Sequence, residues 1–381
     1  MAMFKGPAAA LACAIAVAAC GADVAAPDRP PASPPAAAAA TSQASPRSAL
    51  AAVGAPWPQR VILREDAALQ DASQVLDPAA GVLYALAPGA SGSYVLQAID
   101  LHTGRVRRGA SYRVSGLALA AGYLWVYGQA KAGRPSVLDE TSPRTLATIR
   151  SLSVPGNDEP APAAGPAGSV WAGAGRTLLR ISVRTGAVLA RGVLPAGLEL
   201  SALAASPDAT TLYAAAAQLN AGGAVVLEYT ASTGRRVAQA AGGALKWSAG
   251  GALLTALPAG VWVWFRTGML GLSGLLSAQS LHVVAGLSTT LDAGESPATG
   301  IGTIYDWAMG SSAAYAGGAL WVTTNGGLVA CVNPATGRVR KQERVTSQPI
   351  EVAPDPAARQ IVVVRQSAGV VAITPPRDCW S

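Results

Sequence analysis

The sequence predicts an all-β fold: a seven-bladed β-propeller with four-stranded blades and a ring closed by an N-terminal strand. Three observations predict it. The composition combines 51% hydrophobic residues with only 13% charged residues and 42 glycines, which is typical of a turn-rich β protein. A short aromatic motif recurs along the chain, and a Thr-Gly turn follows several of its copies. Recurrence at a regular interval indicates a repeated structural unit.

The aromatic motif occurs seven times from residue 81 onward. Its copies are GVLYALA (81–87), GYLWVYG (122–128), GSVWAGA (168–174), TTLYAAA (210–216), GVWVWF (260–265), GALWVTT (318–324) and the weaker RQIVVVR (359–365). The aromatic column that they define consists of Tyr84, Trp125, Trp171, Tyr213, Trp262, Trp321 and Val362. Its members are spaced by roughly 40–60 residues, close to the length of a propeller blade. We therefore expect the column to pack between neighbouring blades and to stabilise the fold.

A second pattern follows the aromatic motif. An apolar segment leads through a Thr-Gly pair into a segment that starts with Arg or Val, as in LRISVRTGAVLAR (179–191). Glycine adopts the positive φ of a tight turn without strain, so this pattern predicts a β-hairpin. The turn glycines are Gly104, Gly186, Gly234 and Gly337. With the aromatic strand and the apolar run before it, the hairpin gives four strands per blade.

The seventh copy offers only three strands, at 350–353, 361–365 and 369–374. The segment RVILRE (60–65) lies ahead of the first copy and has the length of a strand. We expect it to complete the last blade and close the ring, because closure removes exposed sheet edges.

Two stretches resemble a known class of repeat. SPDATTLYAAA (206–216) and LWVTTNGGLVACVNPATGRV (320–339) look like the YVTN/NHL-type repeats of bacterial exported propellers and the repeats of virginiamycin B lyase-like propellers. The resemblance covers residues 57–375 and implies the propeller fold. It does not imply one function, because such repeats are carried by unrelated binders, sensors and enzymes.

The N-terminus predicts export. Lys5 precedes an apolar run at 8–19 that is too short to span a membrane as a helix, so residues 1–19 read as a signal peptide. The run ends in Val17-Ala18-Ala19-Cys20, which resembles the bacterial lipobox. The resemblance implies cleavage before Cys20, lipid attachment to its thiol and a place on the extracytoplasmic side of a bacterial cell membrane. An ordinary signal peptide with an incidental Cys is the alternative.

Residues 20–56 are rich in Pro, Ala and Ser and contain few large apolar side chains. Such a segment buries too little apolar surface to fold, so we expect a disordered, lipid-anchored tether ahead of a propeller at 57–381. Cys331 and Cys379 form an even pair in an exported chain, which predicts a disulfide between them. Two buried thiols that never meet are the alternative.

The sequence offers no pattern for catalysis, a metal or a cofactor. The two histidines, His102 and His282, fall at expected turns, and neither has a partner at a zinc-binding spacing. Virginiamycin B lyase-like enzymes use a His, a Glu and a divalent metal, but no motif transfers these roles to either histidine. The net charge of +7 comes from scattered basic residues, which does not predict nucleic-acid binding.

Two segments interrupt the repeat. One is 155–168, and the other is 289–312, which causes the longest gap between copies. The second segment contains three carboxylates, and one of them lies between two aromatic residues. Long connections in compact domains are often functional. We expect a binding loop for an envelope protein or a glycan there, formed by Asp292, Glu295, Tyr305, Asp306 and Trp307. A tolerated surface insertion is the alternative.

These features together predict an exported, lipid-anchored propeller that acts as a non-enzymatic binding or interaction module at the bacterial cell envelope. The alternative is a propeller enzyme of the lyase or hydrolase type with a site in the central channel. A set of His, Glu and Asp side chains that converge in the channel would favour the enzyme.

Overall fold

The computed structural model describes residues 56–64, 73–129, 136–154, 160–218, 224–241, 252–267, 270–277, 281, 283–286, 312–323, 328–335, 339–345, 349–365 and 369–380. All of them belong to one compact unit, Gly54–Ser381. These residues form β-strands and two short 3-10 helices, η1 (Ala90–Gly92) and η3 (Arg377–Trp380). In this part of the chain, no helix has the length and apolar character needed to cross a membrane.

The described strands form antiparallel sheets. One seven-stranded sheet contains β2 (Gln74–Asp77), β3 (Val82–Pro88), β4 (Tyr94–Asp100), β5 (Val106–Ala120), β6 (Tyr123–Gln129), β7 (Val137–Thr141) and β8 (Thr148–Ser153). The next two sheets have four strands each. The first contains β9 (Ala163–Gly165), β10 (Ser169–Ala174), β11 (Thr177–Ser182) and β12 (Val188–Val193). The second contains β13 (Leu198–Ala205), β14 (Thr211–Gln218), β15 (Ala224–Thr230) and β16 (Arg236–Ala241).

The remaining sheets also have four strands. They are β17 (Ala252–Leu257), β18 (Gly260–Thr267), β19 (Leu270–Ser277) and β20 (Val283–Gly286); then β21 (Ala313–Ala316), β22 (Ala319–Thr323), β23 (Leu328–Val332) and β24 (Val339–Arg344). The last sheet runs in the order β25 (Pro349–Asp355), β26 (Gln360–Arg365), β27 (Gly369–Ile373) and β1 (Gln59–Leu63).

The seven-stranded sheet consists of two blades that share the long strand β5. The first half of β5 pairs with β4 up to Tyr112, which lies opposite Tyr94. Its second half pairs with β6 from Arg113, which lies opposite Gln129. One continuous strand is thus the outermost strand of blade 1 (β2–β5) and the innermost strand of blade 2 (β5–β8). By strand pairing, the described residues therefore make seven four-stranded units, the last being blade 7 (β25–β27 with β1).

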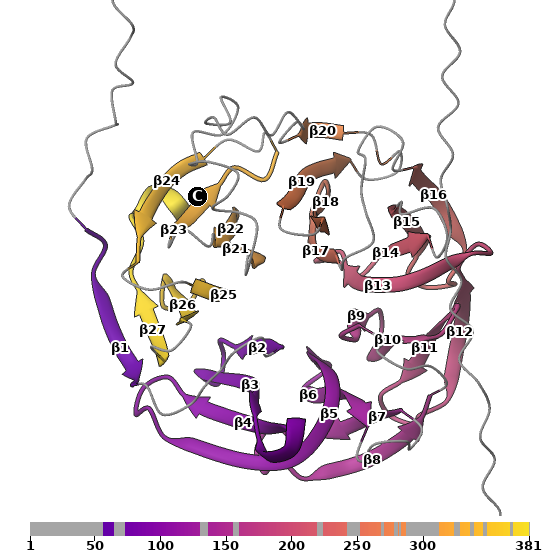
Figure 1. Cartoon of the computed structure of the whole chain (residues 1–381), viewed down its shortest axis with the longest axis horizontal. Coiled ribbons are helices and arrows are strands. Elements are labelled where there is room, and N and C mark those ends of the chain that lie inside the picture. The colour runs from indigo at the N-terminus through magenta and orange to yellow at the C-terminus, as the bar shows by residue number, and fades with distance from the viewer. Residues whose placement is uncertain are drawn as a thin grey trace, which may run out of the picture. The chain divides into compact units, whose positions relative to one another are not determined.

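The first strands of the blades meet in a closed circuit. In chain order, β2, β5, β9, β13, β17 and β21 each contact the first strand of the next blade, and β25 contacts both β21 and β2. Figure 1 shows these strands around the centre of the Gly54–Ser381 unit, with the fourth strands at its periphery. The predicted all-β propeller of four-stranded blades is confirmed. The predicted closing strand is also confirmed, because β1 pairs with β27 from Gln59 opposite Ile373 to Leu63 opposite Val370.

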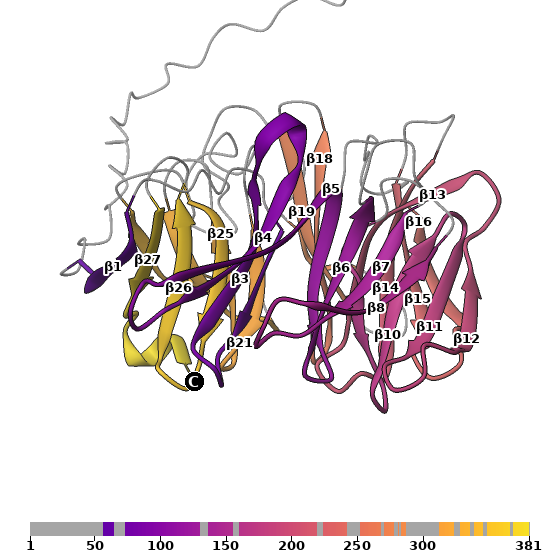
Figure 2. The same cartoon turned by 90° about the horizontal axis from the view of Figure 1, so that it is seen from below.

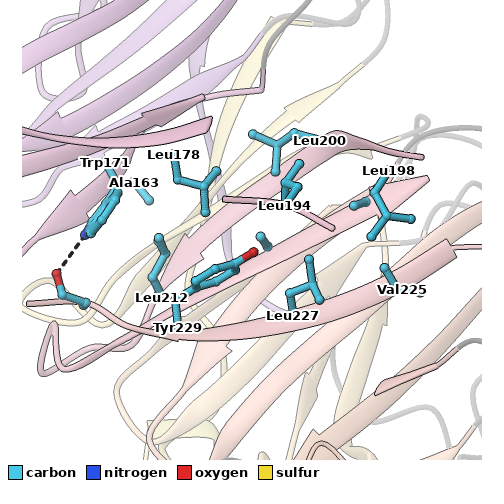
Figure 3. Packing of buried hydrophobic residues seen from close by; sticks show 13 residues of the cluster. Ala163, Trp171, Leu178, Leu194, Leu198, Leu200, Leu212, Val225, Leu227 and Tyr229 are labelled. Carbon is cyan, nitrogen blue, oxygen red and sulfur yellow. Dashed lines mark hydrogen bonds between the residues drawn. The ribbon is translucent and has the colours of Figure 1, made fainter. Parts of the chain in front are cut away.

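The core lies between the blades. Seven hydrophobic clusters are found among the described residues, and each joins the second strand of one blade to that of the next. In the cluster of Figure 3, Trp171 and Leu178 of blade 3 pack against Leu212 and Leu227 of blade 4. The predicted aromatic column provides one residue to every cluster, and no member is more than 3% exposed.

Two members of the column also donate a hydrogen bond to the next blade. The Trp171 Nε1–H donates to the carbonyl oxygen of Ala231, in the turn between β15 and β16, at 3.1 Å (Figure 3). The Tyr84 hydroxyl donates to the carbonyl oxygen of Pro143, in the corresponding turn of blade 2, at 3.2 Å. A buried indole or phenol requires such a partner, so these contacts fix the blades as well as filling the core.

Trp321 has a different neighbour, because blade 7 has no turn between its third and fourth strands. The C-terminal helix η3 occupies this place, and the Trp380 ring lies 4.7 Å from the Trp321 ring between centroids. The structure has a disulfide between Cys331 on β23 and Cys379 on η3, with Cα atoms 5.8 Å apart. Both cysteines are fully buried. The closure of the ring therefore involves both ends of the propeller sequence.

We expect removal of this disulfide to destabilise the propeller. The bond encloses residues 331–379, and cross-linking a loop of that size removes about 4 kcal/mol of unfolded-chain entropy. The double variant Cys331→Ala, Cys379→Ala should lose roughly 2–4 kcal/mol in the free energy of unfolding, measured by denaturant titration. Wild-type protein in reductant should lose the same amount. If reductant has no effect and peptide mapping finds two free thiols, the predicted bond does not form.

The turns between third and fourth strands show why the Thr-Gly pattern recurs. Gly234 has a φ of +72°, and a Cβ atom there would lie 2.6 Å from the carbonyl oxygen of Arg191 in the preceding blade. Gly104 and Gly186 also have positive φ, whereas Gly337 lies outside the described residues. Blade 2 departs from the pattern, because Leu146 adopts this conformation with a φ of 61°. Its buried side chain packs between blades 1 and 2.

The prediction that the segment 155–168 only interrupts the repeat is wrong in part. β9 (Ala163–Gly165) lies within this segment and is the first strand of blade 3. Its three residues, Ala-Ala-Gly, carry no intrinsic strand preference. Pairing with β10, where Ala164 lies opposite Val170, determines their conformation.

Candidate functional site

Strand polarity gives the propeller two unlike faces. In blades 1–6, the turns after the first and third strands lie on one face, which we call the turn face; in blade 7 the turn after the first strand lies there, and the third strand leads into η3. The connections after the second and fourth strands lie on the other, which we call the crossover face because the chain crosses there to the next blade. Figure 2 shows the strands running between these two faces. The distinction matters because loops on a rigid propeller frame are the usual place for ligand contact.

Connections on the turn face are uniformly short. After the first strands they are as short as 121–122 and 317–318, and after the third strands they follow the pattern 101–105, 183–187 and 231–235. Side chains stabilise these turns: in the β4–β5 turn, Asp100 Oδ1 accepts the backbone N–H of His102 at 2.9 Å and that of Thr103 at 2.8 Å. These hydrogen bonds hold the pKa of the Asp100 carboxyl below its usual value.

Connections on the crossover face vary widely. Blade 1 passes into blade 2 within β5 and needs no connection, whereas blade 5 passes into blade 6 through residues 287–312. The predicted loop residues Asp292, Glu295, Tyr305, Asp306 and Trp307 belong to this connection and lie outside the described residues. Its ends are described, however. β20 ends at Gly286 and β21 begins at Ala313, both at the crossover face.

Of the other predicted site residues, Cys20 and His282 also lie outside the described residues. His102 is exposed in the β4–β5 turn on the turn face, as predicted. Cys331 and Cys379 are brought together, but in the buried core between blades 6 and 7. In the described ranges, no three His, Cys, Asp or Glu side chains are grouped so that they could hold a metal ion.

Ser312 anchors the end of the 287–312 connection between two blades. Its backbone N–H donates to Thr323 Oγ1 at 3.0 Å, and its carbonyl oxygen accepts the Thr323 N–H at 2.9 Å. Its hydroxyl oxygen accepts the N–H of Val352, on β25 of blade 7, at 3.3 Å. Ser312 is only 6% exposed, so these contacts hold the end of the loop to the second strand of blade 6, β22, and to the first strand of blade 7, β25.

Glu351 lies beside this anchor and was not predicted from the sequence. It is on β25, one of the first strands that surround the centre of the ring (Figure 1). Burial raises the pKa of the Glu351 carboxyl to about 8, and a hydrogen bond with the Ser312 side chain lowers it in part. At neutral pH this carboxyl is mostly protonated, so it can donate a hydrogen bond or a proton to a ligand. The signal in the sequence is an acid between two apolar residues, Ile350 and Val352, in the strand PIEVAPD.

The raised pKa of Glu351 predicts a pH-dependent stability. Between pH 4.5, the ordinary pKa of a Glu carboxyl, and about pH 8, the folded protein holds a proton on Glu351 that the unfolded chain has released. The contribution is therefore complete below pH 4.5 and is lost as the pH rises to about 8. The free energy of unfolding should fall over this range by at most about 1.4 kcal/mol per pH unit. Denaturant titrations should show a flatter profile for Glu351→Gln, and an unchanged profile would contradict the assignment.

A second buried acid has a structural role. Asp139, on β7 of blade 2, is 7% exposed. Its Oδ2 accepts the hydroxyl of Tyr112 at 3.0 Å and its Oδ1 accepts the hydroxyl of Ser151 at 2.5 Å. Burial, followed by the charge of Asp139, raises the pKa of Tyr112 to about 12. The carboxylate is thus fully engaged in joining the outer part of blade 1 to blade 2.

Comparison with known proteins supports the fold and leaves the family open. No protein-family model and no curated protein matches the chain. Among solved structures, BamB from Moraxella catarrhalis is similar with a TM-score of 0.50 and 16% sequence identity, over 79% of this chain and 83% of that one. Kuenenia stuttgartiensis hydrazine synthase is similar with a TM-score of 0.58 and 12% identity, over 82% and 97%. At these identities, the similarity shows that the chain shares a β-propeller fold.

Proposed function

We propose that the chain is an exported, lipid-anchored propeller that binds a protein or glycan of the bacterial cell envelope through its crossover face. In this proposal, residues 1–19 are the signal peptide, residues 20–56 are the tether and residues 57–381 are the propeller. The similarity to BamB from Moraxella catarrhalis is consistent with a propeller that serves as an interaction module. The YVTN/NHL-like repeats are likewise consistent with an exported protein.

One observation supports the crossover face above all others: the contrast between the two faces. Connections that only reverse the direction of the chain are expected to be short, as they are on the turn face. The crossover face instead joins equivalent strand ends by connections that range from none, within β5, to residues 287–312. Such variation on a constant frame is typical of a face whose loops are shaped by a partner.

The lipid anchor rests on the sequence around Cys20. If the lipobox is cleaved and acylated, mass spectrometry of the mature N-terminal peptide from membrane fractions should find a diacylglyceryl group on Cys20. The Cys20→Ser variant should then leave the membrane fraction. Cleavage at another position, without a lipid on Cys20, would indicate an ordinary signal peptide and would remove the anchor from the proposal.

The enzyme alternative has one supporting observation. Glu351 lies on β25, near the centre of the ring, and has a raised pKa; perturbed acids of this kind occur in catalytic sites. Hydrazine synthase is an enzyme by name, but at 12% identity the similarity shows only a shared fold. Loss of a measurable lyase or hydrolase activity in Glu351→Gln, at unchanged partner binding, would favour the enzyme.

The binding loop gives the sharpest test of the interaction function. We expect the double variant Tyr305→Ala, Trp307→Ala to lose at least about 90% of the envelope material recovered in an affinity pull-down, because paired aromatic side chains often carry most of the binding energy of an interface. The control is His102→Ala, an exposed substitution on the turn face, which should retain recovery. Both variants should unfold at the wild-type denaturant concentration. Full recovery with the double variant would contradict a role for this loop.

A further inference from the structure

The fourth strands of blades 2, 3 and 4 share an exposed apolar residue at the same structural position. Each strand pairs with the third strand through a β-bulge that skips one residue, namely Ile149 in β8, Leu189 in β12 and Val237 in β16. A bulge redirects a side chain away from the regular pleat. The side chains are 53%, 50% and 50% exposed, respectively. We call these three residues the bulge row.

The bulge row lies where the periphery meets the turn face. Each residue comes at the start of its strand, directly after the turn that joins the third strand to the fourth. The three blades are consecutive in the ring, so the row follows one arc of this edge.

The exposed charges on the outer two strands of the blades that carry the bulge row have one sign. On the third and fourth strands and the intervening turns of blades 2–4, the acidic side chains are Asp139, Glu140 and Glu228, and none is more than 7% exposed. The exposed charged side chains on the same segments are Arg144, Arg184, Arg191, Arg235 and Arg236. The basic residues that are scattered along the sequence therefore gather, on this arc, around exposed apolar side chains without an exposed carboxylate among them.

Contacts between blades fix this arc. The Arg150 guanidinium on β8 donates through Nη2 to the carbonyl oxygen of Arg184, in the turn of blade 3, at 3.2 Å. The Arg180 guanidinium on β11 donates through Nη1 to the carbonyl oxygen of Ser232, in the turn of blade 4, at 2.7 Å. Each turn is thereby attached to the blade before it, which fixes the relative positions of the turn backbones of blades 3 and 4 and the blades before them.

We propose that this arc of the turn face docks on the surface of an anionic phospholipid membrane. Apolar side chains that enter the headgroup region and arginines that bind lipid phosphates are the combination that holds proteins at such a surface. The inference rests on the proposed export and anchoring, which place the domain next to a membrane. It adds a direct contact to the lipid anchor and leaves the crossover face free for the envelope partner.

Vesicle co-sedimentation tests the contact without the anchor. All seven clusters and every described strand pairing are internal to residues 54–381, so this unit can be prepared without Cys20. We expect it to bind vesicles that contain phosphatidylglycerol at least about 10-fold more tightly than vesicles of phosphatidylcholine alone, and to dissociate as salt rises. Failure here leaves the lipid on Cys20 and the partner on the crossover face untouched, because those are measured separately.

Matched variants locate the contact. The triple variant Ile149→Ser, Leu189→Ser, Val237→Ser and the triple variant Arg144→Gln, Arg184→Gln, Arg235→Gln should each weaken binding about 10-fold. The control Arg108→Gln, Arg359→Gln, Arg377→Gln removes the same charge from exposed arginines of blade 1, blade 7 and η3 and should bind like wild type.

Three results would overturn the proposal. The first is no binding to anionic vesicles, and the second is an equal loss in the control, which would indicate non-specific charge. The third is another occupant: tighter binding to DNA than to vesicles in a gel-shift assay, or a dimer in analytical ultracentrifugation that the serine variant dissociates.

Discussion

Replacing Trp171 with Ala should lower the free energy of unfolding by about 4–6 kcal/mol, one of the largest effects expected in this chain. The side chain is completely buried in the cluster between blades 3 and 4, and truncation of such an indole costs roughly 3–5 kcal/mol. It also removes the hydrogen bond to the Ala231 carbonyl oxygen, which adds about 1 kcal/mol. Denaturant titration of the Gly54–Ser381 unit measures the change.

Trp171→Phe separates the two contributions. It keeps most of the buried ring but has no donor for Ala231, so it should cost roughly 1–2 kcal/mol. In both variants, binding of the envelope partner should persist wherever the protein remains folded, because the aromatic column has a structural role. A loss of binding at unchanged stability would mean that Trp171 contacts a ligand.

The second large effect is expected at the closure of the ring. Gly369 begins β27 with a φ of +80°, and a Cβ atom there would lie 1.9 Å from the carbonyl oxygen of Leu63, the last residue of β1. Gly369→Ala should therefore cost about 1–2 kcal/mol for the left-handed backbone, with a further loss as β1 is displaced. Displacement would expose the edge of β27, so we expect concentration-dependent oligomers as well as a lower unfolding midpoint.

Gly122→Ala is the matched control for Gly369→Ala. Its φ is +81°, but no atom lies within 4 Å of the position of an added Cβ. It should show the backbone cost alone and remain monomeric in size-exclusion chromatography. Equal losses in the two variants would show that contact between β27 and β1 adds nothing to stability.

The repeats carried enough information to predict the propeller. The recurring column of mostly aromatic residues arises from packing between blades, which imposes the same demand on every copy. Trp171 and Trp321 both meet this demand. The sequence pattern predicts the structure less well where tertiary contacts, and not local residue preferences, determine the conformation. Ala163–Gly165 forms a strand because β10 pairs with it, and Leu146 takes a glycine conformation because its side chain fills the space between two blades.

The candidate site was less predictable than the fold. The long connection at 287–312 was visible as an interruption of the repeat, but its attachment to the crossover face follows from strand polarity. Glu351 has an ordinary sequence context, and its raised pKa arises from burial beside Ser312. The bulge row depends on register: Ile149, Leu189 and Val237 are exposed because the pairing skips them, which apolar periodicity cannot reveal.

The central claim is that the partner binds the crossover face and not the turn face, and site-specific photo-crosslinking in living cells tests it most directly. Two exposed alanines of blade 3 form a matched pair: Ala196, between β12 and β13, lies on the crossover face, and Ala187, between β11 and β12, lies on the turn face. A photoreactive residue at Ala196 should give a discrete protein adduct, and the same residue at Ala187 should give none. A protein adduct from Ala187 alone would contradict the account.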